Sequence, residues 1–118
     1  MRKYAPGILI SDFGRVEVVN AIYQRCFRKQ LAPEAASVLV GAFESDIESG
    51  VLHLRAISES VYTRCLTLMQ LWTPRFGTRA SDVLHVATAV ELKADIFLSF
   101  DTRQMELAKA EGLSCRSA

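Results

Sequence analysis

The chain has few cysteines and no long apolar segment. Its three cysteines are an odd number without CxxC spacing, which excludes a disulfide framework and a cysteine-based zinc site and indicates reduced thiols. No stretch approaches the roughly 20 apolar residues that a membrane helix needs. The N-terminal apolar run is too short for a signal peptide because Ser11 and Asp12 interrupt it. We therefore expect a soluble, cytoplasmic protein without a membrane partner.

The chain also lacks a charge excess, internal repeats, low-complexity segments and linkers. Fourteen basic and 13 acidic residues give a formal net charge of +1 at pH 7, so the net charge alone does not indicate a nucleic-acid partner. Half of the 118 residues are hydrophobic and 23% are charged, as in globular proteins. This length supports one hydrophobic core, so we expect a single domain over residues 1–118.

The clearest pattern lies in residues 79–113. Ser81 is predicted to cap a helix, and the almost unbroken apolar run 96–100 predicts a strand buried on both faces. Asp101 follows at the carboxyl end of this strand, where open α/β sheets bind ligands. A second helix follows and is expected to end at Gly112.

The other elements are predicted from apolar periodicity and from cap and turn residues. They are a buried strand (8–10), a helix from Ser11 to about Gln30, a helix from Pro33 to Gly50, an edge strand (51–57), a helix from Ser58 that Pro74 stops, and a short terminal strand (113–115). Because helices connect the strands, we expect an α/β fold with a parallel β-sheet wrapped by helices.

Three carboxylates lie near predicted strand ends or helix starts: Glu17, Asp82 and Asp101. In a parallel sheet these ends share one edge, so the three side chains are expected to converge. A hard divalent cation such as Mg²⁺ or Mn²⁺ relieves the repulsion among converging carboxylates and can activate water for attack on a phosphodiester. The alternative for each acid is a purely structural role, since acidic residues favour the first turns of helices.

Three segments carry a family resemblance. RASDVLHVATA (79–89) is followed by ADIFLSFDTRQ (94–104) and LAKAEGL (107–113), while ISDFGRVEVVNA (10–21) lies upstream. The first set resembles the C-terminal half of a PIN domain, with the VapC-like toxin ribonucleases of prokaryotic toxin–antitoxin pairs as the closest type. The upstream segment is similar to the family's second acidic motif. Together they span nearly the whole chain in the order of the family.

The resemblance implies a PIN-like three-layer α/β/α domain with Mg²⁺- or Mn²⁺-dependent endoribonuclease activity. Glu17, Asp82 and Asp101 match the family's acidic, metal-binding positions, and Ser99 matches the hydroxyl residue that supports the metal site. We assign Arg79 to contact with RNA phosphate. The resemblance further implies an RNA substrate, a homodimer and a cognate antitoxin that occludes the acidic pocket.

The chain departs from the family at its N-terminus. The family opens with an apolar strand that ends in an aspartate, and no such strand precedes Ile8. The resemblance implies that this strand is central, between the strands predicted at 8–10 and 96–100. Unpaired buried backbone groups cost about 1–3 kcal/mol each. We therefore expect that residues 8–10 pair with residues 96–100, that translation starts upstream, or that another chain fills the gap.

Several other residues and functions are alternatives. Arg15 and Arg75 are further candidates for phosphate contact, and His85 is expected to pack within its helix. The alternative function is a shortened, catalytically impaired PIN-like module for binding or assembly. A phosphoacceptor of the response-receiver type also uses acids at strand ends, but it needs a lysine that does not closely follow residues 96–100.

Overall fold

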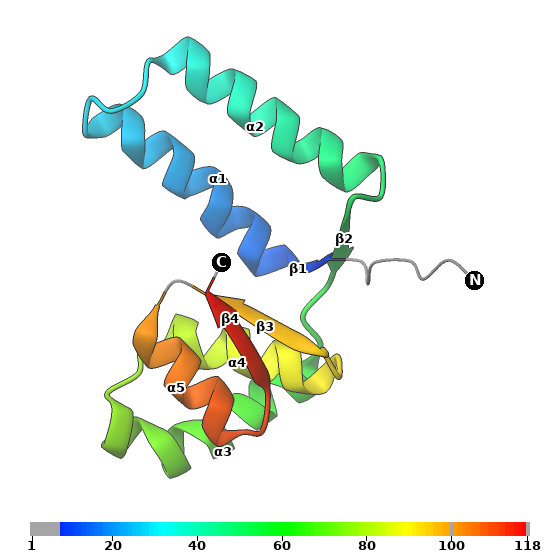
Figure 1. The fold of residues 1–118 in the computed structure, drawn as a ribbon, viewed down its shortest axis with the longest axis vertical. Helices are drawn as coiled ribbons and strands as arrows, with labels where there is room; N and C mark the ends of the chain where they lie inside the picture. The colour runs from blue at the N-terminus through cyan, green and yellow to red at the C-terminus, as the bar shows by residue number, and fades with distance from the viewer. Residues whose placement is uncertain (1–7, 100, 118) are drawn as a thin grey trace. The chain divides into compact units, whose positions relative to one another are not determined.

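The computed structural model describes residues 8–99 and 101–117, and the chain divides into two compact units, Met1–Ala56 and Ile57–Ala118 (Figure 1). Each unit is a mixed α/β arrangement and is described by itself. The N-terminal unit contains β1 (Ile8–Ser11), α1 (Asp12–Phe27), α2 (Pro33–Glu48) and β2 (Leu52–Arg55). The C-terminal unit contains α3 (Glu59–Phe76), α4 (Ala80–Glu91), β3 (Ile96–Ser99), α5 (Thr102–Ala110) and β4 (Ser114–Ser117).

The N-terminal unit is a helical hairpin between two parallel strands. β1 pairs with β2, with Ile8 opposite Leu52. The Ser11 hydroxyl accepts a hydrogen bond from the Gly14 N–H at 2.8 Å, so Ser11 caps α1 as predicted. A Cβ at position 14 would lie 3.1 Å from the side chain of Ile10, so Gly14 lets α1 start close to this side chain.

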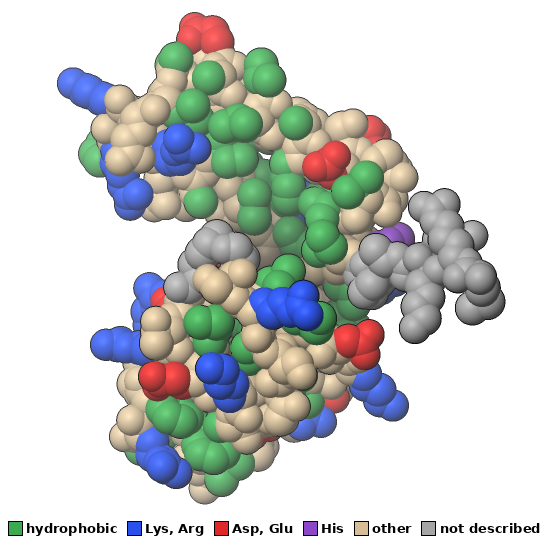
Figure 2. Space-filling model, in the orientation of Figure 1, with side chains coloured by type: hydrophobic (Ala, Val, Ile, Leu, Met, Phe, Trp, Pro, Cys, Tyr) green, Lys and Arg blue, Asp and Glu red, His purple; other side chains and the backbone are tan. Residues whose placement is uncertain are grey.

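The hydrophobic core lies in the C-terminal unit. Its buried residues come from α3, α4, β3 and α5: Val61, Cys65, Leu68, Val83, Val86, Ala87, Phe97, Leu107 and Ala108. In the N-terminal unit, Ala36 is the buried hydrophobic residue among the described positions. Large apolar side chains of α1 and α2 are exposed instead, including Val16, Phe27 and Val38, and hydrophobic side chains are prominent on the surface in Figure 2.

The strands form two parallel pairs, where the sequence predicted one sheet. In the described residues β1 pairs with β2 and β3 pairs with β4, with Ile96 opposite Ser114. The two strands of each pair are connected by helices of the same unit, and each described strand belongs to one of the two sheets. The pairing of residues 8–10 with residues 96–100, the first of the three expectations for the gap, is not among the strand pairs of the described residues.

The expectation that the 96–100 strand is buried on both faces is wrong. β3 has Phe97 and Ser99 buried, but Ile96 and Leu98 are 37% and 49% exposed. The helices of the core therefore cover one face of this strand. Phe100, which the prediction included, lies outside the described residues.

Two helix boundaries also differ from the prediction. Pro74 lies inside α3, which continues to Phe76 and ends at Gly77, a residue with a φ of 62°. Proline's fixed φ fits a helix, and so close to the C-terminus its missing N–H removes only one backbone bond. α4 begins at Ala80 with Arg79 as its N-cap, so Ser81 lies within the first turn and is not the cap. Gly112, with a φ of 84°, follows α5 as predicted.

A pair of leucine substitutions tests the placement of the core. Leu107 is 0% exposed and Leu66 is 70% exposed. We expect Leu107→Ala to lower the free energy of unfolding by about 2–5 kcal/mol, because it removes transfer energy and leaves a cavity. We expect Leu66→Ala to change it by less than about 0.5 kcal/mol. Urea unfolding followed by circular dichroism measures both, and equal losses would contradict this core.

Candidate active site

Four of the five residues predicted for the site lie together in the C-terminal unit. Asp82 is in the first turn of α4, and Asp101 follows β3 as the N-cap of α5. Ser99 is the last residue of β3, and Arg79 is the N-cap of α4. A strand end and two helix starts thus deliver these side chains to one place, as expected at the carboxyl end of a parallel strand.

Asp82 is almost completely buried, with 2% exposure, and both of its carboxylate oxygens are engaged. Its Oδ2 accepts hydrogen bonds from the backbone N–H of Arg79 at 3.0 Å and from the Arg79 Nε at 3.3 Å. Its Oδ1 accepts from Nε2 of Gln104 at 3.3 Å. A buried carboxylate requires such donors and an opposite charge, because burial disfavours its charged form.

Asp101 is less buried and is held by two elements. Its Oδ1 accepts the backbone N–H of Gln104 at 3.0 Å, which caps α5. Its Oδ2 accepts from Nη2 of Arg79 at 3.2 Å. Its own backbone N–H donates to the hydroxyl of Ser99 at 2.9 Å, and Ser99 is 7% exposed. Ser99 therefore orients the chain at Asp101, while its support of a metal site stays a prediction.

Arg79 connects the two carboxylates. Its guanidinium contacts Oδ2 of Asp82 through Nε and Oδ2 of Asp101 through Nη2. The Arg79 side chain is nevertheless 69% exposed, so this bridge lies at the surface of the unit. The two acids, which are 19 residues apart in sequence, therefore share a single cationic group.

Sequence reasoning missed Gln104. Its side chain donates a hydrogen bond to Asp82, and its backbone N–H donates to Asp101, the N-cap of α5. Gln104 therefore links the two acids. The available signal was its spacing, because a residue three positions after an N-cap provides the N–H that the cap accepts. Its second contact depends on tertiary structure and has no local signature.

A cleft of about 380 Å³ adjoins the bridge. It is lined by Arg79, Asp101, Thr102 and Arg103. Nη1 of Arg103 donates to the backbone carbonyl of Gly77 at 3.4 Å, which ties the start of α5 to the end of α3. Two guanidinium groups and the start of a helix thus border this cleft, and such groups favour anions.

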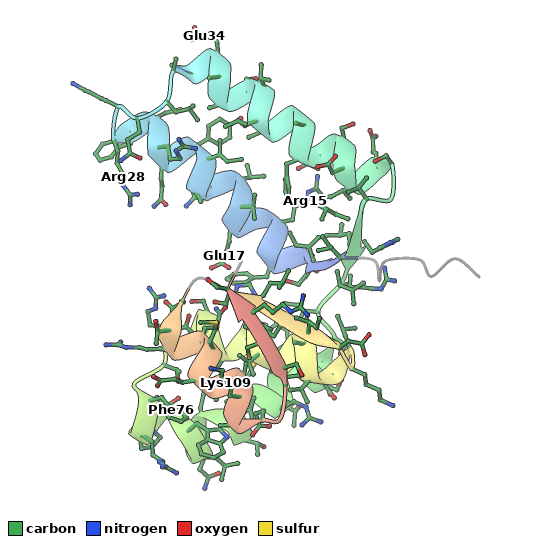
Figure 3. The ribbon with its side chains drawn as sticks, viewed as in Figure 1. Arg15, Glu17, Arg28, Glu34, Phe76 and Lys109 are labelled. Carbon is green, nitrogen blue, oxygen red and sulfur yellow. The ribbon has the colours of Figure 1, made fainter. Side chains whose placement is uncertain are left out.

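Glu17 lies on α1 in the N-terminal unit, where it is half-buried (Figure 3). The structure joins Asp82 with Asp101 within one unit, and Glu17 belongs to the other. The convergence of Glu17 with the two aspartates therefore stays a prediction.

The other candidate arginines have their own partners. Arg15 forms a two-point ion pair with Glu44 across the α1–α2 hairpin, at 2.8 and 3.0 Å. The guanidinium of Arg75 lies 5.7 Å from the ring centre of Trp72 and 5.9 Å from that of Phe76. These contacts account for both side chains without a phosphate ligand.

The donor set at the site suits a hard divalent cation. Asp82 and Asp101 supply carboxylate oxygens, and the fact that one guanidinium reaches both shows that a single cationic group can contact both acids. Mg²⁺ is commonly held by one or two carboxylates while it keeps several waters. Across residues 8–99 and 101–117, no group of three or more His, Cys, Asp or Glu side chains is close enough to hold a metal ion. The set fits a cation held by two acids and water.

Comparisons with known proteins add no family: no family model, curated protein or solved structure matches the chain. In the part of the chain that the structure describes, no helix has the length and apolar character needed to cross a membrane.

The capping role of Asp101 gives a stability prediction. Asp101→Ala removes the acceptor for the Gln104 N–H, and we expect it to lower the free energy of unfolding by about 1 kcal/mol. Asp95→Ala is the matched control, since Asp95 is exposed and precedes β3. Urea unfolding compares the two variants with the native chain. Equal stability of both variants would show that the cap contributes nothing.

Proposed function

We propose that the protein is a PIN-like, metal-dependent endoribonuclease of the VapC toxin type that hydrolyses RNA phosphodiester bonds. The observation that carries this proposal is the buried Asp82 and the nearby Asp101 sharing one cationic group at the end of β3. Two acids placed in this way by different elements would repel each other without a cation. The order and identity of the acidic segments support the same family.

Asp82 and Asp101 would hold Mg²⁺ or Mn²⁺, and Glu17 would supply a further oxygen ligand, as the PIN resemblance implies. The bound ion would lower the pKa of water and neutralise charge on the leaving oxygen. The hydrogen bonds of Ser99 and Gln104 fix the acids in place before any ligand binds. Such preorganisation reduces the cost of reaching the reactive arrangement.

The arginines at the cleft would receive the RNA backbone. Arg79 and Arg103 both line it, together with Asp101, and guanidinium groups bind phosphate through two parallel N–H donors. We propose RNA as the substrate, with a homodimer and a cognate antitoxin as protein partners and the cytoplasm as the compartment. The PIN-like three-layer fold belongs to this proposal as well.

One observation favours the alternative, a catalytically impaired PIN-like module for binding or assembly. All four carboxylate oxygens of Asp82 and Asp101 already accept hydrogen bonds from Arg79 or Gln104. Acids that serve only as helix caps and ion-pair partners would show the same contacts. Activity measurements separate the two functions.

RNA cleavage is the direct test. We expect the full chain to degrade RNA in Mg²⁺ and to lose this activity when EDTA removes the metal. The double variant Asp82→Asn/Asp101→Asn should lower the rate at least about 100-fold, because amides cannot replace both charged ligands. Asp95→Asn is the matched control and should keep full activity. Asp95 is exposed and precedes β3, whereas Asp101 follows it. Equal RNA loss with wild type and the double variant would refute the enzyme and favour the binding module.

Glu17 is tested separately because it comes from the N-terminal unit. We expect Glu17→Gln to lower the cleavage rate at least about tenfold through loss of a charged oxygen ligand. Glu34→Gln, an exposed position on α2, should leave the rate unchanged. Thermal unfolding of both variants checks that the chain remains folded. A Glu17→Gln rate equal to that of Glu34→Gln would remove Glu17 from the site and leave the two aspartates.

A further inference from the structure

We infer that Arg79 is a built-in counter-cation that competes with the divalent metal for Asp82 and Asp101. The inference rests on the proposed function, because it concerns the same two acids. Its basis is that the Arg79 guanidinium contacts Oδ2 of both carboxylates, at 3.3 and 3.2 Å. Asp82 and Asp101 are also the residues that would hold the divalent metal in the proposed function. A metal and the guanidinium therefore occupy the acids in turn.

Electrostatics supports this exclusion. Asp82 and Asp101 bring two negative charges to the site, and Arg79 offsets one of them. A divalent cation that bound beside the guanidinium would be repelled by it at short range. The metal is favoured only when the arginine leaves. In the absence of metal, Arg79 supplies the positive charge that offsets the repulsion between the buried Asp82 and Asp101.

Arg79 is built so that its side chain can move without unfolding α4. The side chain is 69% exposed, so rotation into solvent breaks no core packing. The backbone N–H of Arg79 separately donates to Oδ2 of Asp82 at 3.0 Å, and this bond keeps the start of α4 in place. The contact of Arg79 with Asp101 joins side chains that are 69% and 38% exposed, and ion pairs between exposed side chains contribute little net stability.

The cleft beside the bridge gives the released guanidinium a place and a role. Arg79 already lines this cleft of about 380 Å³ together with Arg103 and Thr102. Once released from the acids, its guanidinium can pair with a phosphate oxygen of RNA there. Metal binding and phosphate binding then support each other, because the metal frees the arginine that the phosphate engages.

Arg103 offers a matched control. It borders the same cleft and carries the same charge, but its Nη1 donates to the Gly77 carbonyl at 3.4 Å, whereas Arg79 contacts both acids. Replacing either arginine by glutamine removes one positive charge close to the acids. Only Arg79→Gln also removes the group that occupies the carboxylate oxygens. The comparison therefore separates direct competition from the general effect of charge.

The experiment is Mn²⁺ binding to the full chain without RNA, measured from the paramagnetic resonance signal of free Mn²⁺. We expect Arg79→Gln to lower the Mn²⁺ dissociation constant about fivefold or more, and Arg103→Gln to lower it less than twofold. Asp82→Asn should abolish this binding in both backgrounds, which locates the ion at the site. Thermal unfolding without metal confirms that each variant is folded.

The outcomes distinguish the inference from the proposed function. Equal affinities for wild type and Arg79→Gln, equal gains in both arginine variants, or no Mn²⁺ binding in any variant would overturn the competition. If the chain cleaves RNA but Arg79→Gln does not raise the Mn²⁺ affinity, the proposed enzyme function stands and the competition by Arg79 is refuted. If Arg79→Gln raises the Mn²⁺ affinity but the chain does not cleave RNA, the competition stands and the enzyme function is refuted.

Discussion

The ion-pair bridge from Asp82 through Arg79 to Asp101 is the interaction on which the site depends. Asp82 accepts the N–H at the start of α4, and Asp101 accepts an N–H in the first turn of α5. Helix N-termini carry partial positive charge, so each acid is stabilised where it lies. The Arg79 guanidinium contacts Oδ2 of both acids, which is the capping oxygen of Asp82 but not that of Asp101, whose Oδ1 caps α5. Helix capping and the proposed chemistry thus use the same two carboxylates, and a substitution that tests one affects the other.

Burial is unevenly distributed, and this determines which part of the site the fold defines well. The C-terminal unit packs α3, α4 and α5 against β3, so Asp82 and Ser99 project from elements anchored by core residues such as Val83 and Phe97. The N-terminal unit relies on caps, backbone pairing and the surface ion pair between Arg15 and Glu44. Surface ion pairs contribute little. The arrangement of the two aspartates is therefore set within the C-terminal unit alone.

Local signals in the sequence predicted part of what is locally determined, although Ser81 is not the cap of α4 and Pro74 does not end α3. Ser11 caps α1 and Gly112 follows α5, because a hydroxyl acceptor and a residue tolerant of positive φ have fixed places at helix ends. The positions of Asp82 and Asp101 at element ends were predicted for the same reason. Tertiary contacts were not predictable in this way. The Nε2 contact of Gln104 with Asp82 depends on how α5 lies beside α4, and the separation of the strands into two sheets depends on pairings that periodicity does not encode.

The functional hypothesis depends on the contacts that join different helices at the site. A helix start often carries an acid for its own capping, so Asp82 alone or Asp101 alone would indicate nothing beyond helix stability. Capping does not require that two acids from different helices contact one side chain, nor that one of them be 2% exposed. A buried carboxylate is costly unless a nearby cation compensates it. An arginine whose side chain remains 69% exposed can supply that charge while it stays in contact with solvent. The sharing of one guanidinium by two acids from different helices is therefore the feature on which the proposed cation-binding site rests.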